Sequence, residues 1–153
     1  MNPANANLQY SGSGLKLTES FEGCRLTPYQ DIRGVWTNGY GNTHGVVPGG
    51  PPITQLQAEQ DLLNNVQWAA NTVRALVTIA LTQGEFDALV DFVFNVGSGN
   101  FASSTLLKDL NANNLTAAAD EFPKWDLAAG QVVAGLLRRR MAEQAEFTSG
   151  ETS

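Results

Sequence analysis

Two carboxylates and a hydroxyl occur close together near the start of the chain. Glu22 is followed nine residues later by Asp31, and Thr37 follows six residues after that. A carboxylic acid can protonate a leaving glycosidic oxygen, while a carboxylate and a hydroxyl can orient a water that attacks from the opposite face. These residue types therefore suit hydrolysis of a glycosidic bond, provided that the fold presents them at one site.

The first of these residues lies at the end of a predicted helix. Ser13 can cap a helix that begins near Gly14 and ends at Gly23, because glycine readily adopts the positive φ found just past a helix. Glu22 would be the last helical residue, near the negative end of the helix dipole and one turn after Glu19. Partial burial, the dipole and the neighbouring charge all disfavour a charged carboxylate, which suits a general acid.

Short alternating segments follow this helix and predict a small antiparallel sheet. The segments are residues 26–30, 35–40 and 43–47, separated by turn residues. A Pro-Gly-Gly-Pro-Pro run at residues 48–52 can continue neither a strand nor a helix. We therefore expect this run to be the boundary between a sheet lobe and the lobe that follows.

The rest of the chain has the periodicity of amphipathic helices. The predicted helices are residues 54–77, residues 82–97, one starting at Ser104, one starting near Leu115, and residues 132–147. Thr54 with Gln57 and Thr82 with Glu85 form predicted capping boxes, and the second of these opens the helix expected to be the buried centre of its lobe. The predicted fold is α+β, with a small antiparallel sheet lobe, a larger all-helical lobe and an active-site cleft between them.

Composition indicates one ordinary domain and limits the classes of partner. The chain has 153 residues, of which 42% are hydrophobic, so we expect a flexible segment at residues 1–12 and a single domain at residues 13–150. Nine Lys and Arg residues face fifteen Asp and Glu residues, for a formal net charge of -6. This excess of negative charge argues against nonspecific binding to nucleic acid or to an anionic membrane.

Single cysteine and histidine residues argue against a disulfide framework and a metal centre. Cys24 is the only cysteine, and we expect it to be a small buried apolar side chain. His44 is the only histidine, is expected in a loop, and has no cluster of ligand-type residues around it, so no metal or cofactor is expected. No signal peptide or run long enough to span a bilayer is visible, and we expect no membrane insertion.

Further blocks of residues follow the carboxylates in a fixed order. They are Asp87-Ala88-Leu89, Phe92-Val93-Phe94-Asn95-Val96-Gly97, Ser104-Thr105-Leu106, Trp125, Gly135-Leu136, Arg139, Arg140 and Glu143. Together with Glu22, Asp31 and Thr37 they resemble the phage-type lysozymes, or endolysins, of glycoside hydrolase family 24. The resemblance covers nearly the whole chain, and several ordered blocks are far more specific than any single one.

This resemblance implies an activity and assigns roles to the matched residues. The implied reaction is hydrolysis of the β-1,4 bond between N-acetylmuramic acid and N-acetylglucosamine in bacterial peptidoglycan. Glu22 would be the general acid, Asp31 would position or activate the attacking water, and Thr37 would help to hold that water. The product would have inverted stereochemistry, an arrangement that calls for roughly 6.5–9.5 Å between the two carboxyl groups.

Three further residues are candidates for contacting the substrate. Tyr40 and Phe94 could line the cleft, because sugar rings stack on aromatic faces, although packing in the core is the commoner fate of such residues. Asn95 could contact a sugar, or it could be a structural amide that bonds a nearby indole such as Trp125. Arg139 and Glu143 are four residues apart on the final helix, and we expect them to form a structural ion pair.

Alternative interpretations remain at the level of sequence. A Glu near a helix end is commonly a solvated surface residue, and an Asp before Arg-Gly commonly serves a turn. A peptidoglycan-binding module could keep this fold with weak or no turnover. A lytic transglycosylase needs only one catalytic acid, and Asp31 with Thr37 argue against it because they serve a water.

Relatives commonly carry a histidine where this chain has Asn42 and an apolar residue in place of Asn38, so an ion pair could be missing.

The expected biology follows from the same resemblance. An endolysin without an export signal would accumulate in the host cytoplasm and reach the wall through a holin-like release system. No exposed apolar stripe is evident in the sequence, so we expect a monomer.

Overall fold

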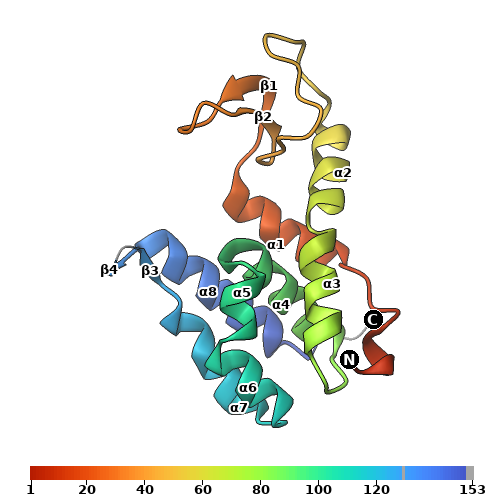
Figure 1. Cartoon of the computed structure of the whole chain (residues 1–153), viewed down its shortest axis with the longest axis vertical. Helices are drawn as coiled ribbons and strands as arrows, with labels where there is room; N and C mark the ends of the chain where they lie inside the picture. The colour runs from red at the N-terminus through yellow and green to blue at the C-terminus, as the bar shows by residue number, and fades with distance from the viewer. Residues whose placement is uncertain (129, 151–153) are drawn as a thin grey trace. The chain divides into compact units, whose positions relative to one another are not determined.

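The structure is a computed structural model that describes residues 1–128 and 130–150. Figure 1 shows its helices and strands, coloured from the N-terminus to the C-terminus. The residues divide into two compact units. The hairpin unit comprises Thr18–Gln67, and the helical unit comprises Met1–Leu17 together with the chain from Trp68 onward. Within the described residues, no helix combines the length and the apolar character needed to cross a membrane.

Helix α1 (Gly12–Glu22) begins earlier than predicted and ends where predicted. Ser11, rather than Ser13, caps it, because the Ser11 hydroxyl oxygen accepts a hydrogen bond from the Gly14 amide at 3.2 Å. The Ser11 amide in turn donates to the buried Asp87 carboxylate at 3.1 Å. At the other end, Gly23 has φ of 67°, which stops the helix directly after Glu22.

Strands β1 (Arg25–Gln30) and β2 (Trp36–Gly39) form the predicted antiparallel pair, in which Tyr29 lies opposite Thr37. The third predicted strand, residues 43–47, is not formed; this segment consists of turns. Beyond β2 the chain turns back and forms an isolated bridge between Asn38 and Asn42. The Asn42 side chain donates to the His44 carbonyl at 3.0 Å, so a local side-chain bond competes with the ladder.

An amide network joins the end of the hairpin to helix α2 (Gln55–Asn65). Asn42 donates to the Asn38 side-chain oxygen at 3.0 Å and accepts from the Asn65 amide at 3.0 Å. Neutral hydrogen bonds therefore stabilise this corner, where the sequence suggested a missing ion pair. Gly39 lets β2 approach α2 closely, since a Cβ there would meet the Ala58 Cβ at 3.2 Å.

The long helix predicted over residues 54–77 is instead two helices, which is a correction. Helix α2 ends at Asn65, and α3 (Gln67–Leu76) follows after Val66. One boundary between the two compact units lies beside this break, between Gln67 and Trp68, and the other lies within α1, between Leu17 and Thr18, whereas the sequence placed the boundary at the Pro-Gly run. Apolar periodicity continues through the break because Val66 remains buried, so the hydrophobic pattern alone did not reveal it.

Helix α4 (Gln83–Val96) is the buried centre of the helical unit, as predicted. Every residue from Gln83 to Val93 is buried, and the predicted capping box between Thr82 and Glu85 is present in both directions. The Phe92 ring packs edge-on against the rings of Phe122 and Trp125, each with a centroid distance of 5.5 Å. Helix α4 also packs against α8 (Ala134–Phe147), the final helix.

Shorter elements surround this core. They are α5 (Ser98–Ala102), α6 (Thr105–Asn111), α7 (Leu115–Glu121), a 3₁₀ helix at Phe122–Lys124, and the strands β3 (Leu127–Ala128) and β4 (Gln131–Val132). Ser104 caps α6 as predicted, with its hydroxyl accepting from the Leu107 amide at 3.0 Å. The β3–β4 pair corrects the expectation of an all-helical lobe and delays the start of the final helix to Ala134.

The N-terminal segment, expected to be flexible, makes specific contacts within the helical unit. Its first residues form a short 3₁₀ helix, Pro3–Asn5, and Asn5 is fully buried. The Asn5 side chain donates to the Ile79 carbonyl at 2.8 Å and accepts from the Leu81 amide at 2.9 Å. These bonds attach the segment to the α3–α4 connection, and its mobility stays a prediction for measurement.

The arginines of α8 pair differently from the prediction. Arg139 does not pair with Glu143; its guanidinium donates to the two Asp91 carboxylate oxygens at 3.0 and 2.8 Å. Arg140 pairs with Glu143, with one bond of 2.9 Å. All four side chains are buried and form what we call the buried ion cluster. Helix spacing allowed either pairing, and only the packing of α8 against α4 turned Arg139 toward Asp91.

Candidate functional site

Asp31 lies in the turn between β1 and β2, where backbone amides hold its carboxylate. One oxygen, Oδ1, accepts from the Arg33 amide at 2.8 Å and from the Val35 amide at 2.9 Å. The other oxygen, Oδ2, lies 3.3 Å from the exposed Arg33 guanidinium. This is Asx-turn chemistry, and it fixes the orientation of the carboxylate within a short turn.

These hydrogen bonds also set the charge state of the site. The Val35 amide lowers the pKa of Asp31 below its usual range, and the Arg33 amide and guanidinium add to that effect. At neutral pH the Asp31 carboxylate is therefore ionised, and its Oδ2 is available to accept a further hydrogen bond. An ionised carboxylate is the form that can orient or activate a water.

Thr37 is buried on β2, and its hydroxyl donates to the Val35 carbonyl at 2.9 Å. Because the proton is committed to that carbonyl, the Thr37 oxygen is left to act as an acceptor toward a ligand. Thr37 lies opposite Tyr29, and Asp31 is two residues beyond Tyr29. Asp31 and Thr37 are therefore diagonal neighbours on one face of the hairpin, a relation that typically spans about 7–8 Å.

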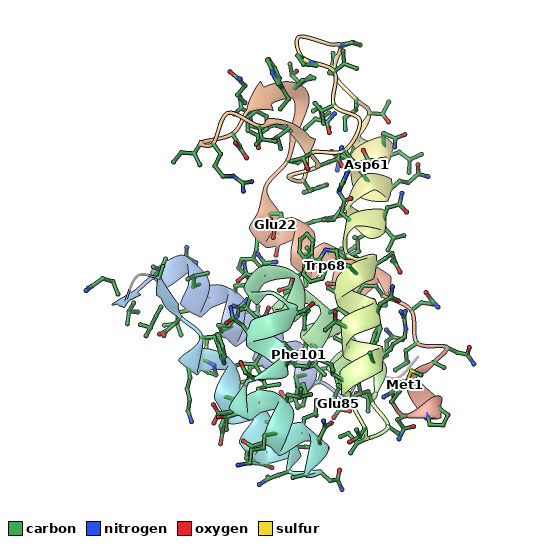
Figure 2. All side chains as sticks on the ribbon, viewed as in Figure 1. Met1, Glu22, Asp61, Trp68, Glu85 and Phe101 are labelled. Carbon is green, nitrogen blue, oxygen red and sulfur yellow. The ribbon has the colours of Figure 1, made fainter. Side chains whose placement is uncertain are left out.

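Glu22 is half-buried at the C-terminal end of α1, where Figure 2 labels it. The chain leaves the helix at Gly23 and enters β1 at Arg25, so Glu22 is only a few residues from the strand that leads to Asp31. Glu22, Asp31 and Thr37 all belong to the hairpin unit.

Tyr40 also belongs to the hairpin unit and is half-buried beside α2. Its hydroxyl accepts a hydrogen bond from the Gln55 amide at 2.8 Å. Partial desolvation raises the pKa of Tyr40, with the nearby carboxylates of Glu19 and Glu59 as smaller contributions, so the phenol is neutral at physiological pH. A neutral phenol with a fixed orientation suits a hydrogen bond to a sugar.

Cys24 is exposed, which corrects the expectation of a buried apolar side chain. It lies between the end of α1 and the start of β1, and its sulfur lies 3.9 Å from the Gln55 side-chain oxygen. Desolvation raises the pKa of the Cys24 thiol, so the residue is mainly a neutral thiol. A lone cysteine gave no sequence signal that separated a connector position from a core position.

Phe94 and Asn95 lie near the end of α4 in the helical unit, apart in sequence and in unit from the residues above. Asn95 is exposed and lines a cavity of about 300 Å³. The other lining residues are Val96, Asn100, Trp125, Leu127, Leu136 and Arg140. Asn95 and Trp125 thus share a cavity, but among the described residues no hydrogen bond joins them.

A larger cavity of about 550 Å³ contains none of the predicted site residues. It is formed by residues of α7, α8 and the start of α4, including Leu115, Met141 and Phe147. Its lining mixes apolar and polar side chains, and it includes the carboxylates of Glu85 and Asp120 but no cationic side chain. We therefore place the candidate site by chemistry rather than by cavity size.

Metal chemistry has no visible support in the described part of the chain. No group of three or more His, Cys, Asp or Glu residues there has the arrangement to hold a metal ion. His44 lies in the loop after β2, as predicted, and its backbone rather than its ring bonds Asn42.

The geometry above can be compared with known proteins. The family model described as phage lysozyme matches residues 19–143, which include all the candidate site residues. The chain belongs to the phage lysozyme family.

Individual relatives agree with this membership. The chain is 42% identical over 145 residues to an endolysin of Bacillus phage PZA, with 94% of the chain aligned. It spans 56% of the length of that relative.

Solved structures share the fold. A crystal structure of a P22 lysozyme variant is 38% identical and has a TM-score of 0.84, covering 91% of this chain and 97% of that one. The muramidase domain of SpmX from Asticaccaulis excentricus is 36% identical and has a TM-score of 0.82, covering 92% of this chain and 97% of that domain. The α+β, lysozyme-like fold expected from the sequence is thereby confirmed.

Sequence reasoning did not identify two features of these surroundings. The backbone amides that hold Asp31 carry no side-chain signal, although an Asp at the start of a short turn between two strands does suggest an Asx turn. Trp68, at the first turn of α3, is 45% exposed and packs against Phe94, and the sequence interpretation gave it no role.

Proposed function

We propose that this chain is an endolysin that hydrolyses the β-1,4 bond between N-acetylmuramic acid and N-acetylglucosamine in bacterial peptidoglycan. The observation that carries the proposal is the ionised Asp31, fixed by two backbone amides on the same hairpin face as Thr37 and following Glu22 closely in the chain. Family membership and the muramidase domain among the similar structures support it. Residues 13–150 would be the catalytic part of the chain.

Glu22 is the proposed general acid. Its place as the last residue of α1, partly shielded from water, suits a carboxyl group that donates a proton to the leaving glycosidic oxygen. Proton donation lowers the barrier because the leaving group departs as a neutral hydroxyl rather than as an alkoxide.

Asp31 and Thr37 are proposed to hold the attacking water. The water would donate one hydrogen bond to Asp31 Oδ2 and another to the Thr37 oxygen, whose own proton is committed to Val35. With both protons directed at the protein, a lone pair of the water faces the sugar. Removal of one proton by Asp31 would then complete the attack, leaving the product with inverted configuration.

Three residues are proposed to contact the substrate. Tyr40 would hydrogen-bond a sugar through its phenol, which Gln55 already orients. Asn95 would use its exposed amide, which has no hydrogen-bond partner among the described residues, and Phe94 would supply an aromatic face. The amide and carbonyl of an N-acetyl group match the donor and acceptor of an Asn side chain.

The biological setting is also part of the proposal. The enzyme would act as a monomer, be held in the host cytoplasm until a holin-like pore forms, and then act on the wall. No cofactor is proposed for this reaction, because acid, base and water suffice for it.

The experiment is digestion of purified peptidoglycan by the wild type and by Glu22→Gln, with mass spectrometry of the released muropeptides. We expect muramic acid at new reducing ends from the wild type and at least a 100-fold slower release from the variant, because Gln cannot donate the proton. NMR of the fresh product would show the inverted anomer first. A retained anomer would overturn the water-positioning role of Asp31.

Two results would replace the proposal. Release of anhydromuramic products would assign a lytic transglycosylase, in which Asp31 and Thr37 do not serve a water. Binding without release by the wild type would leave a peptidoglycan-binding module. Thr37→Val is a useful second variant, since it keeps the shape of the side chain and removes the hydroxyl.

A further inference from the structure

Trp68 and Phe94 form an aromatic pair on the surface of the helical unit. Their ring centroids are 6.0 Å apart with an angle of 39° between the ring planes. Trp68 is 45% exposed at the first turn of α3, where Figure 2 labels it, and Phe94 is half-buried near the end of α4. Two helices therefore combine to present one open aromatic surface, in a unit where the neighbouring Phe92 ring is fully buried.

Polar groups without protein partners border this pair. Among the described residues, the indole N–H of Trp68 donates to no acceptor. The side-chain amide of Asn95, the residue next to Phe94, also has no hydrogen-bond partner there. Asn95 also lines the cavity of about 300 Å³ that contains Trp125 and Asn100. An aromatic surface with open donors and acceptors at its edge fits a ligand that has both apolar faces and polar edges.

The scaffold below the pair is fixed by hydrogen bonds. The hydroxyls of Thr72 on α3 and Ser98 on α5 bond each other at 2.8 Å, linking the two helices one turn away from the rings. Asn100 donates to the Val96 carbonyl at 2.8 Å, which joins α5 to the end of α4. These bonds reduce the entropy lost when a ligand binds to the aromatic surface.

We propose that Trp68 and Phe94 are a stacking platform for the glycan strand, continuous with Asn95 and the cavity beside it. Pyranose rings present C–H groups on their faces and hydroxyl or N-acetyl groups at their edges, which matches this surface. The platform carries no charge, as suits neutral sugar units, so its contribution is insensitive to salt. The inference rests on the proposed function for the identity of the sugar.

The test is steady-state cleavage of soluble, uncrosslinked peptidoglycan strands by the wild type, Trp68→Ala and Trp68→Tyr. We expect Trp68→Ala to raise KM about tenfold while kcat stays within about twofold, because stacking on the platform would stabilise the bound substrate and the transition state equally. Trp68→Tyr keeps a ring and should recover most of the loss. Phe94→Ala should raise KM in the same direction.

Met141→Ala is the matched control. Met141 is 48% exposed, lies on the same unit, and lines the other cavity, so removing it should leave KM unchanged. An unchanged KM in Trp68→Ala, or an equal rise in Met141→Ala, would overturn the proposal. Thermal unfolding of each variant would identify a loss that comes from misfolding.

Binding without cleavage separates this inference from the proposed function. Glu22→Gln is titrated with the same strands while its indole N–H resonances are followed by NMR, with Trp68→Phe used to assign the Trp68 signal. A shift of that signal, with weaker binding after Trp68→Ala, supports the platform even if the wild type proves unable to cleave. Normal cleavage with no response of the Trp68 signal would refute the platform and leave the proposed function intact.

Discussion

Carboxyl groups lie next to arginines in two regions of the chain, and the two environments shift the pKa of the carboxyl group in opposite directions. In the hairpin turn, Asp31 lies near the surface, and backbone amides keep its pKa low. In the buried ion cluster, burial raises the pKa of Glu143 well above its usual range, and the hydrogen bond and charge of Asp91 raise it further against the opposing effect of Arg140. One carboxyl group is kept ionised, and the other is driven toward its neutral form.

The difference teaches what each carboxylate is for. Amides in a turn stabilise the charge without excluding water, so the ionised group can still serve a reaction at the surface. Burial between α4 and α8 excludes water from the buried ion cluster. Its ion pairs therefore hold the two helices together, and substrate cannot reach them. Charge near an arginine is therefore a poor guide to function unless the solvent exposure is known.

The largest expected effect is the loss of activity in Asp31→Asn. The amide oxygen can still accept the Arg33 and Val35 amides, so the turn should be kept, but the group can no longer take a proton from water. We expect kcat to fall about 100-fold to 10,000-fold with little change in Tm. Muropeptide release and thermal unfolding measure the two quantities. Unfolding without a specific loss of activity would show that Asp31 serves the turn alone.

Arg139→Met should have the largest effect on stability. It leaves the fully buried Asp91 without its bidentate partner, which should lower the free energy of unfolding by about 3–5 kcal/mol. Urea denaturation measures this change. Arg138→Met is the neighbouring control, because Arg138 is exposed and its replacement should cost less than about 0.5 kcal/mol. Equal effects of the two variants would contradict a specific role of the cluster.

The pH dependence of stability should show the protonation of Glu143. Its pKa is higher in the folded protein than in the unfolded chain, so its contribution is fully present below the unfolded value of about 4.5 and is lost as pH rises through the folded value. Urea denaturation of the wild type and of Glu143→Gln between pH 5 and 9 tests this, because Gln mimics the neutral acid. The advantage of the wild type over the variant should shrink as pH rises, and a constant difference would be evidence against a neutral Glu143.

The smallest expected effect is that of Arg33→Ala. The ion pair between Arg33 and Asp31 is exposed, whereas the Val35 amide is the larger cause of the lowered pKa of Asp31. The pKa of Asp31 should therefore rise slightly and stay below its usual range, as followed by NMR titration of the side-chain carboxyl carbon. A return to the ordinary carboxyl pKa would show that the guanidinium, rather than the amides, controls the site.

Local chemistry explains which elements could be predicted. The end of α1 follows from Gly23, and the start of α4 follows from Thr82 and Glu85, because a cap needs only residues a few positions apart. The prediction of a third strand at residues 43–47 was wrong because the Asn42 side-chain amide bonds the Asn38 side chain and the His44 carbonyl, which favours a turn over strand pairing. The break between α2 and α3 was not predicted, because the buried Val66 fits the apolar pattern of a helix on both sides of the break.

The sequence by itself determined the chemistry available to this protein: the order of Glu22, Asp31 and Thr37, the helix end and the hairpin that carry them, and the blocks that mark the phage lysozyme family. The tertiary structure alone decided which groups water reaches. It buried Arg139 against Asp91, exposed Cys24, and combined Trp68 with Phe94 on one surface. Caps and turns depend on neighbours in the chain, whereas the Arg139–Asp91 pairing between two helices joins residues 48 positions apart.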